Sequence, residues 1–402
     1  MKKKTHNMFI YRLLRFIAGI YTNLKFKKKV LRNEIRKQKG PFVVIANHQC
    51  ALDFMYMLAL KTKTPVSLVI SDAFYRTTPL KKYMDKVGVI AKQQFQTSTS
   101  DIKKMKKVID DNGALVFYPA GLMCEDGVST PIPESTYKFL KWLKADVYVA
   151  KVSGSYFVKP KWSKKMRPGR TYLDVYKLYD KETLAVEPLD SVKENVVKAL
   201  SFDAYKEQET LKVKYKGGEN IEGLENVLYA CPHCKSEFTV KVKDEKTIYC
   251  KNCGFTQTSD EYGFMRKESK IGQEIRYPSE WNKIILNDLR EKIYKNPDFS
   301  MTEKALISMI DDEKCKFVPV GEGTVSVNSE RITVTGVING EQRTVEVPTG
   351  AFASLPFVPG ERLEVQDGDD IYRCALGDGK QVMKFVNAVK IFYELKNNVK
   401  VD

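Results

Sequence analysis

Near the start of the chain, a histidine that follows an asparagine and precedes an aspartate has the spacing needed for proton transfer. Residues 47–53 read Asn-His-Gln-Cys-Ala-Leu-Asp, so a histidine stands five positions before a carboxylate. On a regular helix these two side chains would point about 140° apart, so they can meet only if His48 lies in a loop and Asp53 begins a helix. Asp53 would then orient the imidazole, and His48 would act as a general base toward a hydroxyl group. A histidine that is only hydrogen-bonded at a strand end is the alternative.

The chain offers few other imidazoles for this chemistry. It has three histidines, of which His6 lies among lysines at the N-terminus and His233 lies between two cysteines. Because imidazole is the side chain that exchanges protons near neutral pH, we assign the base to His48. Cys50 lies inside the same motif and is the alternative as a nucleophile.

Four of the eight cysteines have the spacing of a metal site. They form two C-x2-C pairs with 15 residues between the pairs, which is typical of a four-cysteine zinc ribbon. Two disulfides are the alternative, but the abundance of lysine and the lack of an export signal favour a reducing cytoplasm. We therefore expect one structural Zn2+ bound by Cys231, Cys234, Cys250 and Cys253.

The elements around the histidine alternate between strand and helix patterns. Strands are predicted at residues 42–46, 66–70, 88–91, 114–118, 147–152 and 171–179, and helices at 52–60, 99–111 and 133–144. Such alternation indicates an α/β sheet with helices on both faces. The loops that carry His48 and Gly121 should then meet at one edge of the sheet.

The motifs in this half resemble those of the lysophosphatidate and glycerol-phosphate acyltransferase family. The first is Asn-His-x4-Asp at 47–53, and the next three lie at 87–92, 117–121 and 147–156, in the family's order. The resemblance covers about residues 8–200. It implies a glycerolipid acyltransferase-like mixed sheet and an enzyme similar to 1-acylglycerol-3-phosphate O-acyltransferase. In that family the pair equivalent to His48 and Asp53 activates an acceptor hydroxyl for direct attack on an acyl thioester.

The same resemblance implies the substrates. The acceptor would be a lysophospholipid, with lysophosphatidate favoured, and the donor would be acyl-CoA or an acyl-carrier protein, in phospholipid synthesis. The residues that it places at the substrate are Asn47, Lys92, Pro119 and Gly121.

The third motif departs from the family pattern Phe-Pro-Glu-Gly-Thr-Arg. Ala120 stands where the family has glutamate, and Met123 stands where it has arginine. Glu125 and Asp126 offer a displaced carboxylate, and the alternative is that both are ordinary loop residues. An acyltransferase for another lipid acceptor is therefore kept as a second hypothesis.

The charge distribution predicts an anionic partner. The net charge is +17; residues 1–40 contain 13 Lys or Arg and one acidic residue, and residues 151–170 contain seven cations and no acid. Both stretches lie in the half that resembles the acyltransferases, which favours anionic membrane lipid over nucleic acid. A solvated charged face is the alternative.

Residues 8–21 are apolar but shorter than the roughly 20 residues that a membrane span requires. At 100° per residue, one arc of a helix in this segment would carry Phe9, Ile10, Leu13, Leu14, Phe16, Ile17 and Ile20. This pattern indicates a helix at the membrane interface, and a helix packed on its own domain is the alternative. We expect a cytoplasmic protein that is peripheral on the inner face of the cell membrane.

The second half of the chain changes from helical to strand patterns. Helices are predicted at residues 281–294 and 301–310, strands at 323–327, 331–337, 343–348, 361–366 and 371–376, and a last helix at 381–395. The architecture resembles a pleckstrin-homology-like or GRAM-type domain, which is an antiparallel β-barrel closed by a helix.

These observations predict four domains. They are an acyltransferase domain with an N-terminal interfacial helix at 1–222, a zinc ribbon at 223–265, a helical connector at 266–312 and a pleckstrin-homology-like β domain at 313–402. A non-catalytic zinc-ribbon adaptor that binds nucleic acid or protein is the competing class.

Overall fold

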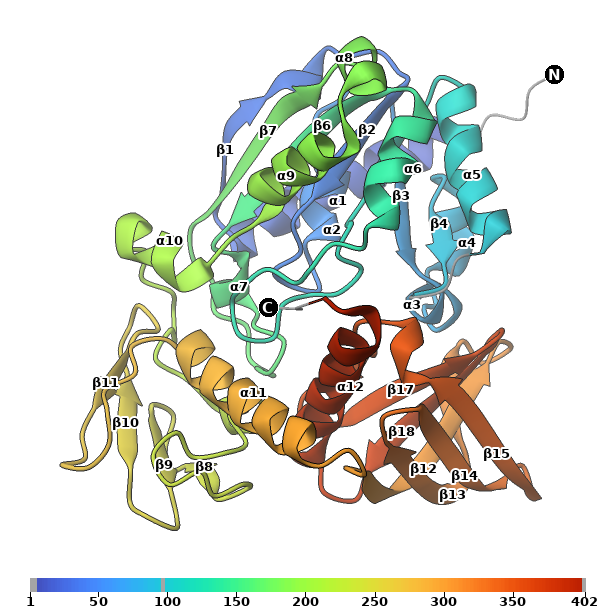
Figure 1. Ribbon diagram of the computed structural model, residues 1–402. Helices are drawn as coiled ribbons and strands as arrows, with labels where there is room; N and C mark the ends of the chain where they lie inside the picture. The colour runs from blue at the N-terminus through green and yellow to red at the C-terminus, as the bar shows by residue number, and fades with distance from the viewer. Residues whose placement is uncertain (1–5, 95–97, 400–402) are drawn as a thin grey trace. The chain divides into compact units, whose positions relative to one another are not determined.

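The computed structural model describes residues 6–94 and 98–399 and divides the chain into two compact units (Figure 1). The first unit consists of Met1–Pro160 and Met166–Lys216, and the second of Lys161–Lys165 and Gly217–Asp402. The chain therefore passes between the units three times.

The first unit contains a mixed seven-stranded sheet. The family resemblance implies a mixed sheet, and six of the seven strands are predicted from the sequence. Strands β6 and β7 pair antiparallel, whereas the other neighbouring strands pair in parallel. The strand order is β1 (Lys28–Asn33), β7 (Thr171–Tyr179), β6 (Asp146–Ser153), β2 (Phe42–Ala46), β5 (Ala114–Phe117), β3 (Val66–Ser71) and β4 (Ile90–Lys92). The sequence analysis missed β1, because this edge strand is lysine-rich and mostly exposed.

Helices cover both faces of this sheet (Figure 1). Val43 and Ile45 of β2 belong to a buried cluster with residues of α5 (Thr99–Asp110), α6 (Ser135–Leu143) and α9 (Leu189–Leu200). The alternate side chains, Phe42 and Val44, point to the opposite face, behind which α1 (Met8–Lys25) and α2 (Phe54–Leu58) lie. The shorter helices of this unit are α3 (Asp72–Arg76), α4 (Lys81–Lys86), α7 (Ser155–Val158), α8 (Lys181–Val186) and α10 (Ala204–Leu211).

The second unit begins with a small antiparallel sheet around the cysteine pairs. Its order is β11 (Met265–Lys267), β10 (Thr256–Ser259), β9 (Thr247–Cys250) and β8 (Val240–Val242). The predicted hairpin between the two cysteine pairs is β8 and β9, which pair antiparallel. Helix α11 (Pro278–Lys295) follows, close to the predicted helix at 281–294.

A larger antiparallel sheet and a last helix complete the second unit. The order of the seven strands is β15 (Glu341–Pro348), β14 (Arg331–Ile338), β13 (Lys316–Val327), β12 (Met301–Asp311), β18 (Asp370–Leu376), β17 (Arg362–Asp367) and β16 (Phe357–Val358). Helix α12 (Gln381–Asn397) packs on this sheet. The antiparallel β domain with its helix is confirmed, and β15 and β16 are its two edges, so the strand pairing of the described residues does not close into a barrel.

The prediction of a helix at residues 301–310 is wrong, because this segment is strand β12. Burial alternates along its first half, where Ala305 and Ile307 are buried and Leu306 between them is exposed. The strand pairs along its whole length with β13 and in its middle with β18. These pairings join segments far apart in the chain and override a local pattern that also fits a helix.

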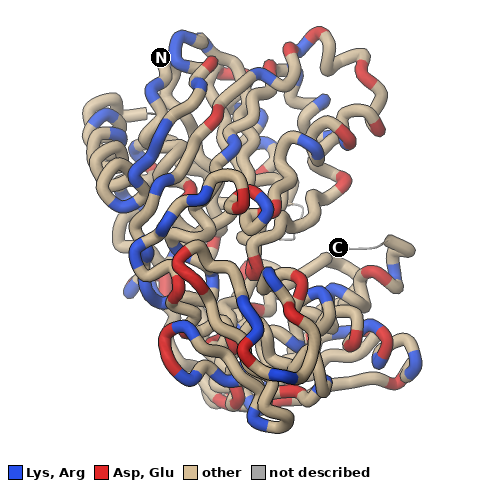
Figure 2. Tube along the Cα trace, turned by 90° about the vertical axis from the view of Figure 1, so that its left-hand side faces the viewer, with Lys and Arg blue, Asp and Glu red and all other residues tan. Residues whose placement is uncertain are grey.

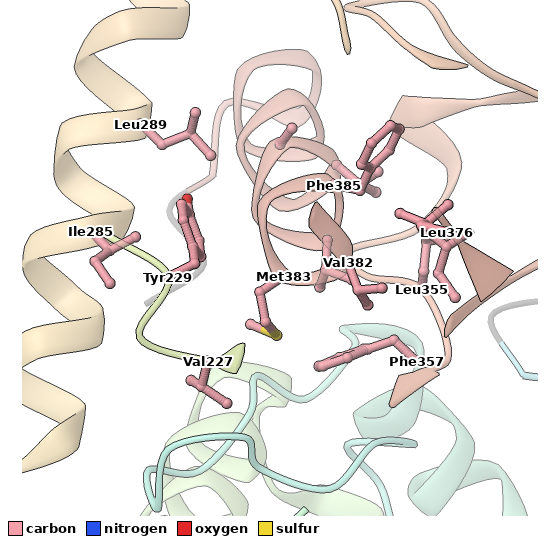
Figure 3. Close-up of a cluster of buried hydrophobic side chains, with 14 of the residues drawn as sticks. Val227, Tyr229, Ile285, Leu289, Leu355, Phe357, Leu376, Val382, Met383 and Phe385 are labelled. Carbon is pink, nitrogen blue, oxygen red and sulfur yellow. The ribbon is translucent and has the colours of Figure 1, made fainter. Parts of the chain in front are cut away.

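The ribbon, helix α11 and the large sheet share one hydrophobic core. Figure 3 shows Tyr229 from the ribbon segment, Ile285 from α11 and Met383 from α12 within one cluster of buried side chains. Two of the ribbon cysteines, Cys231 and Cys250, belong to the same core. The ribbon is therefore packed into this unit rather than forming a core of its own.

The short segment Lys161–Lys165 belongs to the second unit. Trp162 is buried in the core of that unit. Gly223 passes so close to it that an added Cβ would lie 2.2 Å from the Trp162 carbonyl oxygen, and its φ of +97° also favours glycine. The entry of the chain into the second unit is thus fixed by contacts at Trp162.

Candidate active site and metal centre

The predicted site residues of the first unit lie where parallel strands end. His48 follows β2, Lys92 ends β4, and Pro119 and Gly121 follow β5. Because these strands run in parallel in one sheet, their carboxyl ends lie at the same edge. The topology thus brings these segments to one side of the sheet.

His48 and Asp53 meet as the spacing predicts. His48 lies in the loop after β2, Asp53 is the residue before α2, and His48 Nδ1 is 3.1 Å from Asp53 Oδ2. The same oxygen accepts hydrogen bonds from the backbone N–H groups of Gln49 at 2.6 Å and Cys50 at 2.9 Å. Asp53 is fully buried, whereas the His48 side chain is 19% exposed. The carboxylate therefore fixes one ring nitrogen and leaves Nε2 for a substrate.

Asn47 holds this loop to the neighbouring strand. Its Nδ2 donates to the carbonyl oxygen of Val152 at 2.8 Å, and its Oδ1 accepts from the Val152 N–H at 2.8 Å. The side chain is buried. Asn47 was expected at the substrate, but its amide binds the backbone of β6, so it positions His48 from within the protein.

Gln49 anchors the other side of the same loop. It is fully buried, and its Oε1 accepts from Ser155 Oγ and from the N–H of Tyr156, both at 3.2 Å. The loop after β5 adds a further contact, because the N–H of Cys124 donates to the His48 carbonyl oxygen at 3.4 Å. The loop that carries the base is therefore hydrogen-bonded to β6, to α7 and to the loop after β5.

Cys50 is poorly suited to be the nucleophile. The residue is fully buried. Burial, and then the nearby Asp53 carboxylate, raise the pKa of the Cys50 thiol well above its usual range. Because the thiolate is the reactive form, this environment favours the inert thiol.

The three remaining substrate candidates line the adjoining loops. Lys92 Nζ donates to the carbonyl oxygen of Gln93 at 2.9 Å, and burial lowers the pKa of Lys92 while the Asp101 charge offsets part of that shift. Pro119 is buried. Gly121 has a φ of +71°, and a Cβ added to it would meet no atom of the described residues within 4 Å. Its carbonyl oxygen accepts from Gln94 Nε2 at 2.8 Å, which ties the loops after β4 and β5 together.

The two carboxylates considered as replacements for the family glutamate differ in their surroundings. Glu125 is buried, with 7% of its surface exposed. Asp126 is half-buried, and its Oδ1 accepts from the N–H of Val128 at 3.2 Å, as a loop-shaping aspartate does. This contact supports the interpretation of Asp126 as a loop residue.

Sequence reasoning missed Tyr118 as a neighbour of the base. Its ring stacks on the His48 imidazole, with centroids 4.4 Å apart and planes inclined by 28°. The only signal in the sequence was its place at the end of a predicted strand, in the third motif. This position predicts the sheet edge at which Tyr118 lies, but it does not predict the direction in which the ring points.

The four ribbon cysteines come together as predicted. Their sulfur atoms all lie within 4.8 Å of one another, and the Cys231–Cys253 and Cys234–Cys250 sulfur pairs are each 3.7 Å apart. Four sulfurs at about 2.3 Å from a tetrahedral ion are about 3.8 Å apart, whereas a disulfide requires about 2.05 Å. The four thiol groups therefore fit one tetrahedral metal ion.

The outer side of α1 carries exposed apolar side chains. Tyr11, Ala18 and Thr22 form the buried side of this helix. The exposed side carries Met8, Phe9, Leu13, Phe16, Ile17, Ile20 and Leu24. Five basic residues lie at the end of this helix and just after it, namely Lys25, Lys27, Lys28, Lys29 and Arg32. Figure 2 marks the Lys and Arg positions along the chain. Among the described residues, no helix is both long and apolar enough to span a membrane.

Comparison with known proteins gives a family match within the first unit and similar solved structures. Residues 27–155 match the family model described as Acyltransferase. One similar structure is the 1-acyl-sn-glycerophosphate (LPA) acyltransferase PlsC from Thermotoga maritima, at 16% identity and a TM-score of 0.42, covering 51% of this chain and 80% of that chain. Another is the Ran binding domain of the nuclear complex component Nup2 from Ashbya gossypii, at 13% identity and a TM-score of 0.20, covering 25% of this chain and 97% of that chain. No curated protein sequence matches the chain.

Proposed function

We propose that the acyltransferase segment, residues 27–155, moves a fatty acyl group from a thioester donor to a hydroxyl of a lysophospholipid. The observation that carries this proposal is the His48–Asp53 pair, with Nδ1 and Oδ2 3.1 Å apart, inside that segment. The buried carboxylate holds the imidazole by one nitrogen, and the part of the ring that is exposed can meet an acceptor.

The chemistry follows from this arrangement. His48 Nε2 takes the proton of the acceptor hydroxyl as its oxygen attacks the thioester carbonyl carbon. The Asp53 carboxylate stabilises the imidazolium that forms. The new C–O bond is completed as the C–S bond breaks, and the imidazolium returns its proton to the leaving thiolate. Because the transfer is direct, it requires no acyl-enzyme.

The acceptor that we favour is lysophosphatidate, and the donor is acyl-CoA or an acyl-carrier protein, as a step of phospholipid synthesis. A second candidate acceptor is another hydroxyl lipid, because Ala120 and Met123 replace the charged residues of the family motif. Lys92 is the cation of the second motif, and the ammonium group of this half-buried residue donates to the Gln93 carbonyl oxygen. Because this ammonium group already binds a backbone carbonyl, acceptors without a terminal phosphate should be assayed together with lysophosphatidate.

The deciding experiment is lipid mass spectrometry after incubation of the intact protein with both donors and a panel of lyso-acceptors. Acyl transfer that is lost in His48→Ala and kept in His233→Ala, whose histidine is exposed in the ribbon, supports the proposal. Transfer that survives His48→Ala contradicts it. Intact-protein mass spectrometry during turnover should show no acyl adduct, whereas an adduct on Cys50 would favour the nucleophile hypothesis.

We also propose that the protein is cytoplasmic and peripheral on the inner face of the cell membrane, where its lipid substrate lies. The exposed apolar side of α1 supports this location, and so do the exposed Val30 and Leu31 of the lysine-rich strand β1 that follows it. An apolar helix face beside basic residues is suited to an anionic lipid surface.

For the second unit we propose that the four-cysteine centre binds zinc in a structural role. The sulfur–sulfur distances of 3.7 Å support a tetrahedral ion, and all-thiolate sites in proteins favour zinc. Because the cysteines pack into a core shared with the large sheet, bound zinc would stabilise the whole unit.

A further inference from the structure

Tyr118 presses against the candidate base His48 from the end of β5. The ring centroids of Tyr118 and His48 are 4.4 Å apart and the contact is stacked. The tyrosine hydroxyl is buried and has no hydrogen-bond partner within residues 6–94 and 98–399. The tyrosine ring therefore contacts the imidazole, while its buried hydroxyl can still donate a hydrogen bond.

A second buried polar atom in the same place belongs to Asp53. Its Oδ2 meets His48 and two backbone N–H groups, whereas its Oδ1 has no partner among the described residues. Burial, and then the charges of Asp53 and Cys50, raise the pKa of Tyr118 well above its usual range. The carboxylate and the tyrosine contact the same imidazole, the carboxylate at Nδ1 and the tyrosine through its ring. Buried polar atoms of this kind are ordinarily satisfied, often by an ordered water.

We propose that Tyr118 is a positioning residue for His48, with a ring that fixes the plane of the imidazole and a hydroxyl that binds Asp53 Oδ1 through one buried water. The inference rests on the proposed acyl transfer, since it concerns the support of the same base. The stack keeps Nε2 directed at the acceptor while Nδ1 stays on Asp53.

Two substitutions separate the ring from the hydroxyl. Tyr118→Phe keeps the stack and removes the hydroxyl, and should lower kcat about fivefold, which is the effect of one hydrogen bond. Tyr118→Leu removes both and should lower kcat about 10–100-fold with little change in KM. Tyr83→Leu, at an exposed tyrosine of α4, is the matched control.

NMR of the histidine ring protons reports on the same contact without turnover. The chain has three histidines, so the His48 signal is the one that disappears in His48→Ala. Loss of the ring current should shift that signal in Tyr118→Leu, because the tyrosine ring is stacked on the imidazole. The signal should keep its position in Tyr118→Phe and in the control.

Three results would overturn the proposal. An unmoved His48 signal in Tyr118→Leu would show that the rings do not stack in solution. A rise in KM with kcat unchanged would make Tyr118 a substrate contact. An undiminished kcat and melting temperature in Tyr118→Phe would show that the hydroxyl has no partner. If the intact protein transfers no acyl group, the proposed function fails, and the NMR signal still decides whether Tyr118 positions His48.

Discussion

Asn47 and Val152 exchange two hydrogen bonds of 2.8 Å, with the side-chain amide of one meeting the backbone N–H and carbonyl of the other. The amide thereby extends the pairing of β2 and β6 by one residue beyond Ala46. The residue directly before the base is thus hydrogen-bonded to the neighbouring strand β6. The position of His48 depends on this contact as well as on Asp53.

Asn47→Ala should therefore reduce both stability and activity. It leaves the N–H and the carbonyl of Val152 without their partner, which costs about 1–3 kcal/mol of unfolding free energy for each buried group. Thermal melting and kcat, measured on the same preparation, check this. Asn195→Ala, which removes a single bond to Tyr179 Oη in the same unit, should be milder. Equal losses in the two variants would contradict a special role for Asn47.

Asp53→Asn should leave the fold intact and lower kcat about 10²–10⁴-fold. The amide oxygen can still accept from the N–H groups of Gln49 and Cys50, but the amide cannot stabilise an imidazolium. Steady-state kinetics test the loss of kcat, and circular dichroism tests whether the fold is intact. Asp180→Asn, which changes a helix-capping aspartate of α8, should keep nearly full activity. Near-normal turnover in Asp53→Asn would remove the pair from the mechanism.

Vesicle binding should depend on the exposed side of α1. The double variant Phe9→Ser/Phe16→Ser removes side chains that are 79% and 66% exposed. Full burial of such a side chain is worth about 1.5–3 kcal/mol, so co-sedimentation with anionic vesicles should weaken at least about tenfold. Val186→Ser, at an 82% exposed valine of α8, is the control and should bind normally. Undiminished binding of the double variant would place the lipid contact elsewhere.

The same binding should weaken as salt rises, because the Debye length falls from about 10 Å at 0.1 M to about 3 Å at 1 M. Neutralising Lys25, Lys27 and Lys29 to Gln should have a similar effect. Lys28 is left unchanged because its Nζ donates to Thr22 Oγ1 at 2.9 Å. Salt-independent binding, or retention on nucleic acid at the same salt, would argue for another partner.

Removal of the metal should destabilise the second unit as a whole. Elemental analysis should find about one zinc per chain, and Cys234→Ser or a strong chelator should release it and expose this unit to proteolysis. The reason is the core that Cys231 and Cys250 share with the large sheet. Cys315→Ser, outside the four-cysteine cluster, should change nothing. Full zinc loss with unchanged protection from protease would show that the ion is dispensable.

Stability should fall as the pH drops below about 6.5, in part because of His6. Burial lowers the pKa of His6, and its hydrogen bond to the Val66 carbonyl offsets some of this. The unfolded chain, with a histidine pKa near 6.5, then binds the proton more readily than the folded chain, so acid favours unfolding. Melting at pH 7 and pH 5 should show a smaller difference in His6→Asn than in the unaltered chain.

The sequence correctly predicted those features that one short segment determines by itself. The strand at 42–46, the turn that joins His48 to Asp53 and the two cysteine pairs are local patterns, and the structure has them as expected. Strand β12 was wrongly predicted as a helix because its partners β13 and β18 are set by distant pairing. The roles of Asn47 and Tyr118 also depend on which strands are neighbours, β6 for one and β5 for the other, and the order of motifs does not give that.

The five-residue segment Lys161–Lys165 has a consequence for protein dissection. It lies between two stretches of the first unit, yet it supplies Trp162 to the core of the second. A fragment that ends at Lys216 would take this tryptophan away from its surroundings, and a fragment that starts at Gly217 would lack it. No single cut releases either unit with all of its own residues. Point variants of the whole chain are therefore better suited than truncations to test acyl transfer or zinc binding.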